Sequence, residues 1–397
     1  MLEYFAPNEV KTDAFVAFSL LFQPWKWRKG REVHNLKRRL KSRFFSSDTT
    51  LSVYYSSRGA LYQYMKALRL PHGTHVLISP IAPMYHILCM KELELIPTYV
   101  DTYSDLTMSF TDLQKKYDST ASLILLDHPF GITPKKRREI IGFAKKMKVP
   151  LLETLDSGGD LELYRNVAFQ SAVLLSFGFD SMFSSVSGAV LAVRGKKQSE
   201  LVKTIEKNIP NPSHIDLLRM IIFKMATVAI KTFNKVKLGR LLHITLSSFG
   251  LFPAMHSKKE HRGSFDSTYV KTFPNIAASL LFPQLDRFND VLQTRASTIR
   301  EMKSHDPYAL PVPETSLPFY PVCVTKNHPT SARTSFKKLK IKKPKNAALQ
   351  HPETISLYVK GTCPQTEKVY SDLYLLPTNI TQKQQLMFHH LLNGMSG

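Results

Sequence analysis

The hydrophobic and polar positions of residues 50–200 follow two alternating patterns. Short apolar runs such as HVLISP (75–80) and ASLILLD (121–127) are typical of buried strands, whereas MYHILCMKELEL and PKKRREIIGFAKKMK have the spacing of helices. Strand and helix patterns that alternate in this way predict a mostly parallel sheet covered by helices. Functional residues are then expected at the carboxyl ends of the strands.

A second apolar region, residues 214–252, is interrupted by cations at helix-like intervals, beginning with Arg219 and Lys224. These interruptions argue against a membrane span and favour a pair of amphipathic helices, packed on the protein body, on a second subunit or on a membrane surface. The apolar run at 14–22 is shorter than the roughly 20 residues that a spanning helix needs. Neither a signal peptide nor a transmembrane segment is therefore expected.

The composition is that of a globular protein, with 43% apolar and 21% charged residues among 397. This length favours two domains. The predicted division is a basic N-terminal arm at 1–44, a large domain at 45–255 and a smaller C-terminal α+β domain at 256–397.

The chain carries a strong positive charge, because 54 Lys and Arg residues against 31 Asp and Glu residues leave a net charge of +23. Such a surplus favours an anionic partner. The cations are dense at 25–45 and 336–345, without the spacing of an RNA-binding strand or a zinc finger, so nucleic acid is disfavoured against an anionic membrane surface or a solvated basic face. Three widely spaced cysteines indicate neither disulfides nor zinc and fit the cytoplasm.

Six segments carry a family resemblance: SSRGALYQYMKAL, HVLISP, IPTYVD, LLDHPFGI, VPLLETLDSGGD and LSFGFDSMFSSVSGAVLAV. In order and spacing they resemble the DegT/StrS family of sugar aminotransferases, which are pyridoxal-phosphate (PLP) enzymes. CPQTEKVYSDLYLLPTNITQKQQLMFHHLL, at 363–392, resembles the closing strand and helix of that family. The resemblance implies an aspartate-aminotransferase-like large domain (PLP fold type I) and a smaller C-terminal domain.

The same resemblance implies that three groups required for PLP chemistry are missing. Ser181 stands at the position of the lysine that forms the Schiff base, and a hydroxyl cannot form an imine. Thr154 stands where an acid faces the pyridine nitrogen, and Ile81 stands where an aromatic side chain stacks on the ring. The joint loss argues against a working transaminase.

Acidic neighbours leave a shifted ring acid open as an alternative. Strand alternation sends Glu153 to the face opposite Thr154, whereas Asp156 shares the face of Thr154 if the strand continues that far. His128 follows a buried strand and either faces the pocket or is satisfied within the core, and the second alternative is favoured.

The phosphate side of the site is better kept. A turn of small residues precedes a helix, whose free amides and dipole favour an anion. The resemblance assigns cofactor binding there, and beside the lysine position, to Ser57, Arg58, Gly59, Ser157 and Ser176.

Three functions remain open. The first and favoured is a non-catalytic homologue in nucleotide-sugar or surface-polysaccharide biosynthesis, which binds a nucleotide sugar or pairs, as a homodimer or as a heterodimer with an active homologue. The second is an enzyme that uses PLP or pyridoxamine phosphate (PMP) without the lysine. The third is a membrane-surface-associated protein of polysaccharide or lipid metabolism, at the inner face of the membrane. Covalent attachment of a cofactor is not expected, and the absence of any cofactor is an open alternative.

Overall fold

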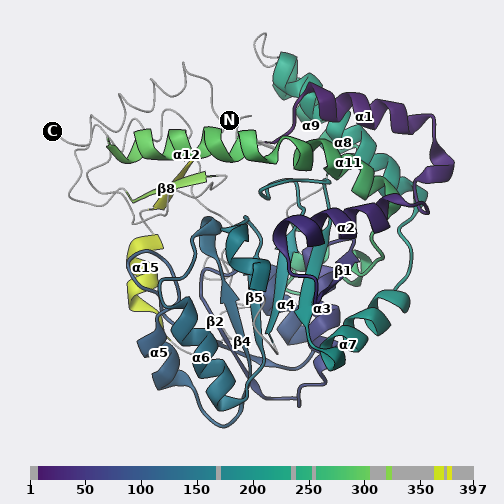
Figure 1. Ribbon diagram of the computed structural model, residues 1–397. Coiled ribbons are helices and arrows are strands. Elements are labelled where there is room, and N and C mark those ends of the chain that lie inside the picture. The colour runs from purple at the N-terminus through teal and green to yellow at the C-terminus, as the bar shows by residue number, and fades with distance from the viewer. Residues whose placement is uncertain are drawn as a thin grey trace.

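The computed structural model describes residues 8–166, 171–233, 238–252, 256–304, 319–323, 362–370 and 373–377. Its centre is a seven-stranded sheet with the order β1-β7-β6-β5-β4-β2-β3 (Figure 1). The strands are β1 (Thr49–Tyr54), β2 (His75–Ile78), β3 (Ile96–Tyr99), β4 (Ala121–Asp127), β5 (Leu151–Leu155), β6 (Ser171–Ser176) and β7 (Ala189–Arg194).

The sheet is mostly parallel, as predicted. β3, β2, β4, β5 and β6 pair in parallel, and β7 runs antiparallel to both of its neighbours, β6 and β1. The parallel pairs need crossover connections, which the intervening helices supply. The predicted α/β class is thereby confirmed.

Helices cover both faces of the sheet. The helices of the described residues are α1 (Lys11–Leu21), α2 (Glu32–Phe44), α3 (Ser57–Leu68), α4 (Met84–Glu92), α5 (Phe110–Lys116), α6 (Arg137–Met147), α7 (Lys196–Lys207), α8 (His214–Phe233), α9 (Leu238–Ser248), α10 (Lys258–His261), α11 (Asn275–Asp286), α12 (Phe288–Ser304) and α15 (Pro364–Tyr370). Short 3₁₀ turns lie at η2 (Pro24–Lys26), η3 (Pro129–Gly131), η4 (Leu161–Asn166) and η6 (Ser267–Tyr269).

Alternation along the strands decides which core each side chain joins. On β6, Ala172 and Leu174 pack with α3, α4 and α7, whereas Val173 and Leu175 pack with α2, α11 and α8. A third cluster lies beneath α5 and α6. β4, β5 and β6 are buried on both faces, so β4 and β6 are largely apolar along their whole length, whereas β5 also buries Glu153 and Thr154.

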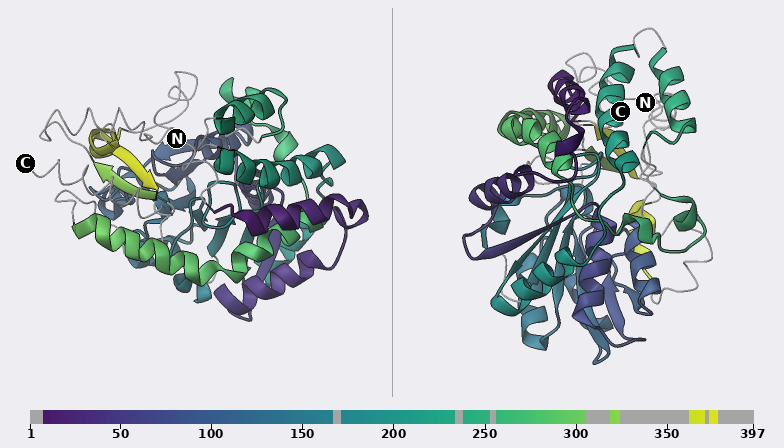
Figure 2. Two further views of the ribbon diagram at one scale, coloured as in Figure 1. Left: turned by 90° about the horizontal axis from the view of Figure 1, so that it is seen from above. Right: turned by 90° about the vertical axis from the view of Figure 1, so that its right-hand side faces the viewer.

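The N-terminal residues pack into the same apolar core as the sheet. Ala17 of α1 and Leu36 and Leu40 of α2 are fully buried there. Figures 1 and 2 show α1 lying beside α8 and α11 at the end of the molecule opposite α6. The cationic side chains of 25–45 are thus carried by elements that are folded onto the body.

Only part of the predicted small domain, 256–397, lies among the described residues. The described part includes α12, the antiparallel pair β8 (Phe319–Cys323) and β9 (Leu373–Pro377), and α15. The basic cluster 336–345 and the end of the predicted closing helix, 378–392, lie outside the described residues. The domain limits stay predictions.

Candidate functional site

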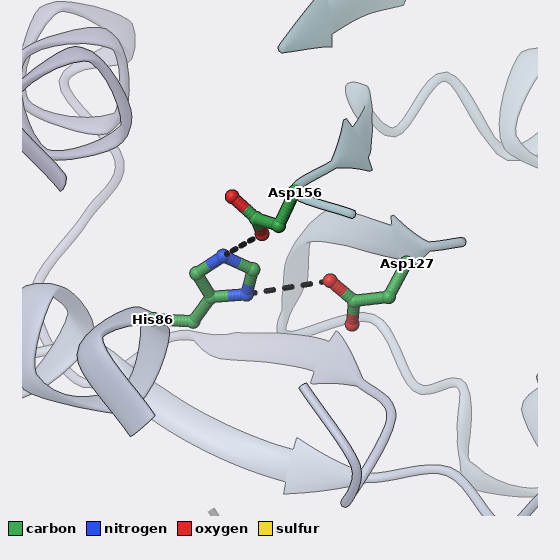
Figure 3. A group of neighbouring side chains, drawn as sticks. All are labelled: His86, Asp127 and Asp156. Atoms are coloured by element: carbon green, nitrogen blue, oxygen red, sulfur yellow. Dashed lines mark ion pairs between the residues drawn. The ribbon is translucent and has the colours of Figure 1, made fainter. Parts of the chain in front are cut away.

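A buried histidine and two aspartates meet at the carboxyl edge of the sheet (Figure 3). Asp127 ends β4, Asp156 directly follows β5, and His86 lies on α4, which follows β2. Nδ1 of His86 is 3.3 Å from Oδ1 of Asp127, and Nε2 is 3.2 Å from Oδ2 of Asp156. Each ring nitrogen thus faces its own carboxylate at ion-pair distance, although off the axis of a straight hydrogen bond.

The two carboxylates hold this histidine in its charged form. Burial by itself lowers the pKa of His86, but Asp127 and Asp156 outweigh burial and raise the pKa to about 9. At neutral pH the ring is therefore an imidazolium between two carboxylates. Its side chain is fully buried, whereas that of Asp156 is 23% exposed.

Tyr85 and Thr154 close the cluster on two sides. The hydroxyl of Tyr85 donates to Oδ1 of Asp156 over 2.5 Å, and its ring stands edge-on to that of His86 at 4.4 Å between centroids. The hydroxyl of Thr154 donates to Oδ1 of Asp127 over 2.5 Å. Thr154, the position that the resemblance gives to the ring acid, is therefore in direct contact with an acid of the neighbouring strand.

His86, Asp127 and Asp156 also form the one group of potential metal ligands that comes together among the described residues, with one ligand atom from each within 4.8 Å of the others. A metal ion takes a lone pair from one ring nitrogen and holds its ligands around a single point. Here the two nitrogens point at different carboxylates. The contacts match an ion-paired imidazolium better than a metal centre.

The lysine position, Ser181, is fully buried and its hydroxyl is engaged. Its Oγ donates to the carbonyl oxygen of Asp156 over 2.8 Å and lies 2.8 Å from Oγ of Ser176, which in turn accepts from the amide of Gly178. The two serines that the resemblance places five residues apart are thus brought together and bonded to each other.

The loop after Ser181 is packed into the core. Phe183 lies between Phe44 and Phe288, with ring centroids 6.2 and 5.3 Å away. The side-chain amide of Asn8 donates to the carbonyl oxygen of Ser181 over 2.6 Å. These contacts fix the loop from both sides.

At the predicted phosphate side, the first turn of α3 is packed against another segment. The amide of Gly59 donates to Oγ of Ser56 over 3.0 Å, and a Cβ on Gly59 would lie 2.5 Å from the carbonyl oxygen of Tyr269. Ser57 is buried beside it. Arg58 turns away to Glu260, with 3.0 Å between Nη1 and Oε2.

The remaining predicted positions are spread around the edge. Ile81 is buried in the turn between β2 and α4, and Ser157 is half-buried after β5. Glu153 lies on the face opposite Thr154, where it accepts from Arg137 over 2.6 Å and lies 3.2 Å from Nε2 of His128. His128 is thus satisfied within the core, as the sequence favours.

Neither the motifs nor the family resemblance singles out His86, Asp127 or Tyr85. A histidine inside the apolar run MYHILCM was the signal for a buried polar group, but its partners lie 41 and 70 residues further along the chain. Asp156 is the residue that strand alternation leaves open as a shifted ring acid. Its meeting with His86 depends on the parallel order of β2, β4 and β5, which puts three strand ends side by side.

Comparison with known proteins supports the architecture. No protein-family model and no curated protein matches this sequence. The fold is that of the PLP-dependent sugar aminotransferases of the DegT/StrS type, as the resemblance implied.

Among solved structures, the chain is similar to Helicobacter pylori PseC, an aminotransferase involved in the biosynthesis of pseudoaminic acid, with a TM-score of 0.73 and 12% identity over 98% of this chain and 97% of that one. It is also similar to the aminotransferase TlmJ of Streptoalloteichus hindustanus, at 0.71 and 13% over 98% and 96%. A third is the Brucella abortus DegT DnrJ EryC1 StrS aminotransferase, at 0.71 and 12% over 98% and 96%.

PLP or PMP is therefore the class of cofactor that the likeness supports, and the side chains present can be tested against it. A covalently held cofactor needs an amine, and position 181 offers a buried hydroxyl. Its ring needs room near Thr154, and the imidazole of His86 lies there with Asp127 and Tyr85. The residues of this chain do not fit the group.

Proposed function

We propose that this protein is a catalytically impaired sugar-aminotransferase homologue that acts as a binding or partner subunit in nucleotide-sugar or surface-polysaccharide biosynthesis. The observation that carries the proposal is the imidazolium of His86 between Asp127 and Asp156, beside the position where the resemblance places the cofactor ring. An internal cation takes the place of the pyridinium, and an internal hydroxyl takes the place of the lysine.

The electrostatics support this replacement. In the enzymes that the chain resembles, an acid balances the positive charge on the pyridine nitrogen of the cofactor. In this chain, Asp127 and Asp156 balance the positive charge on the imidazole ring of His86 instead. The hydroxyls of Tyr85 and Thr154 occupy one oxygen of each carboxylate. A free ring entering this place has to break two ion pairs and two hydrogen bonds, all of them largely buried.

The sugar-related role rests on likeness. PseC is an aminotransferase involved in the biosynthesis of pseudoaminic acid, and the chain is also similar to Spr1654 of Streptococcus pneumoniae, which is described by its similarity to sugar aminotransferases. A scaffold of this shape without the reactive amine can still bind a nucleotide sugar or pair with an active chain. Ser181 is a poor base, which speaks against an active enzyme that works without the lysine.

Titration with PLP tests the impaired site. The wild-type protein is mixed with PLP, reduced with borohydride and mapped by peptide mass spectrometry. No stoichiometric adduct at a single lysine is expected, and such an adduct would overturn the proposal.

A pair of variants tests whether His86 takes the place of the ring. Ser181→Lys supplies the amine, and Ser181→Lys with His86→Ala also removes the imidazole while leaving Asp127 beside Thr154. PLP should label the introduced lysine in the double variant and not in the single one. Equal labelling of both variants would show that the imidazole of His86 does not block the position of the cofactor ring.

A partner role predicts a specific complex. Co-expression with an intact homologue from the same genome, followed by size-exclusion chromatography, should give a mixed dimer whose transaminase activity depends on this chain. The same activity from the homologue alone would remove the partner role without touching the result for the cofactor.

A further inference from the structure

Exposed apolar side chains gather at one end of the molecule. Among the described residues, every strongly exposed large apolar side chain lies in 10–25 or 215–249, with the single exception of Met147 on α6. Single exposed apolar residues are ordinary, but their concentration in one region marks a contact surface.

The first stretch forms a stripe on α1. Phe15, Phe18 and Phe22, spaced by three and four residues, are 73%, 48% and 64% exposed, and the rings of Phe18 and Phe22 are 5.3 Å apart. Trp25, in the 3₁₀ turn η2, extends the set and is 70% exposed. We call these four residues the aromatic stripe. The opposite side of α1 is buried in the core, so the stripe is not needed to hold the helix in place.

The second stretch lies on the neighbouring helices. On α9, Leu238, Leu241 and Ile244 are 55%, 61% and 54% exposed. α1 packs along α8, α8 packs along α9, and the views of Figures 1 and 2 place the three helices together at one end. A buried ion pair between Lys224 of α8 and Glu9, 2.7 Å long, ties α8 to the segment that precedes α1.

Cations predominate among the charges of these two stretches, and the one acid of the second stretch, Asp216, pairs with Lys271 over 2.7 Å. Lys26 and Lys29 are exposed next to Trp25. The one acid between positions 10 and 31 is Asp13, which is buried and held by Arg287 at 3.0 Å, and positions 217–259 contain no acid at all. Exposed aromatic and aliphatic side chains among cations are the pattern of helices that lie in the interface of an anionic membrane.

We propose that the aromatic stripe and the exposed face of α9 dock this protein onto an anionic membrane surface. The side chains of Phe15, Phe18 and Phe22 enter the headgroup region, Trp25 lies at the boundary with water, and Lys26 and Lys29 contact lipid phosphates. No helix among the described residues is both long and apolar enough to cross a membrane, so the contact is peripheral.

Two other occupants fit less well. A second copy that docks through the same face brings cations against cations, because a two-fold contact uses the same patch twice. A different protein partner also fits less well. The cores of protein interfaces are depleted of lysine, whereas here Lys26 lies directly beside Trp25.

Vesicle flotation of the full chain tests the proposal. The protein should float with phosphatidylcholine vesicles that contain phosphatidylglycerol and should stay at the bottom with phosphatidylcholine alone. Phe15→Ser, Phe18→Ser and Phe22→Ser together should lower the partition coefficient at least about tenfold, because three aromatic rings lose their apolar contact. Lys26→Gln with Lys29→Gln should lower it about fivefold per lysine.

A matched control is available on α6. Lys145→Gln with Lys146→Gln removes the same charge from exposed positions at the opposite end of the molecule and should leave the partition coefficient unchanged. Equal losses from the α1 and α6 pairs would reduce the effect to net charge and overturn the proposal, and so would wild-type binding by the triple serine variant.

The two tryptophans of the chain give a second readout. Trp25 is exposed, whereas Trp27 is buried and donates to the carbonyl oxygen of Leu20 over 2.7 Å. Anionic vesicles should shift the wild-type fluorescence to the blue, and Trp25→Phe should abolish the shift. Concentration-dependent dimers that the triple serine variant abolishes, with no vesicle binding by the wild type, would assign the face to a second copy instead. Neither readout depends on whether the site at β4 and β5 accepts a cofactor.

Discussion

The carboxyl edge of the sheet and the face of α1 and α9 depart from ordinary packing in opposite directions. At the sheet edge, charged side chains are buried and satisfied by one another: His86 lies between Asp127 and Asp156. On the face of α1, the side chains of Phe15 and Phe22 are 73% and 64% exposed to water. In the first region, side chains of the protein fill the position that a cofactor has in the fold it resembles. In the second region, apolar side chains are exposed on a surface that is usually polar in a globular protein. The membrane contact that we propose therefore lies at the second region.

The sharpest test compares two phenylalanines. Phe183→Ala should lower the free energy of unfolding by about 4 kcal/mol, because the ring is buried between Phe44 and Phe288 and leaves a cavity. Phe18→Ala should change it by no more than about 0.5 kcal/mol, because the ring is 48% exposed. Urea denaturation followed by circular dichroism measures both. Similar losses would mean that the aromatic stripe is part of the core.

Removal of one carboxylate tests the other region. Asp127→Ala should lower the free energy of unfolding by about 3 kcal/mol, because it strips a buried imidazolium of one partner and leaves the hydroxyl of Thr154 without its acceptor. Asp286→Ala is the control. It breaks an ion pair with Arg39, but the side chain of Asp286 is 66% exposed, so the loss should cost no more than about 1 kcal/mol. An equal cost for both would contradict the buried cluster.

The pH dependence of stability should carry the signature of His86. Its pKa is raised to about 9 in the folded protein from an ordinary 6.5. A raised pKa gives a stabilisation that is complete below about pH 6.5 and lost as the pH rises through about 9, and the shift corresponds to at most about 3 kcal/mol.

Denaturation midpoints at pH 6 and pH 9.5, compared between the wild type and His86→Gln, isolate this contribution. Burial lowers the pKa of Lys231 to about 8, which changes stability in the opposite direction over part of the same range, and the subtraction removes it. Identical pH profiles of the two proteins would show that the ring is neutral.

The smallest effect concerns the lysine position. Ser181→Ala removes the hydrogen bond to the carbonyl oxygen of Asp156 and the 2.8 Å contact with Oγ of Ser176, and should cost about 1 kcal/mol. Ser297→Ala, an exposed helix position, should cost less than about 0.5 kcal/mol. A stabilised Ser181→Ala would mean that the hydroxyl is strained rather than satisfied.

Periodicity and the order of motifs predicted much of the fold and part of the candidate site. The buried strands at 75–80 and 121–127, the fold class and the absence of the lysine at position 181 could all be predicted, because strand and helix periods and a position in a motif are local properties. The opposite orientations of Glu153 and Thr154 also followed from alternation along one strand.

Only the tertiary structure decided what fills the site and what lies on the surface. His86 meets Asp127 and Asp156 because three parallel strands end side by side, and no spacing along the chain records that order. Phe15 and Leu20 of α1 are equally apolar in the sequence, yet one is exposed and the other buried, because α8 and α11 cover a single side of the helix. Residue type sets what a side chain can do, and the packing of distant elements sets whether it meets a partner or water.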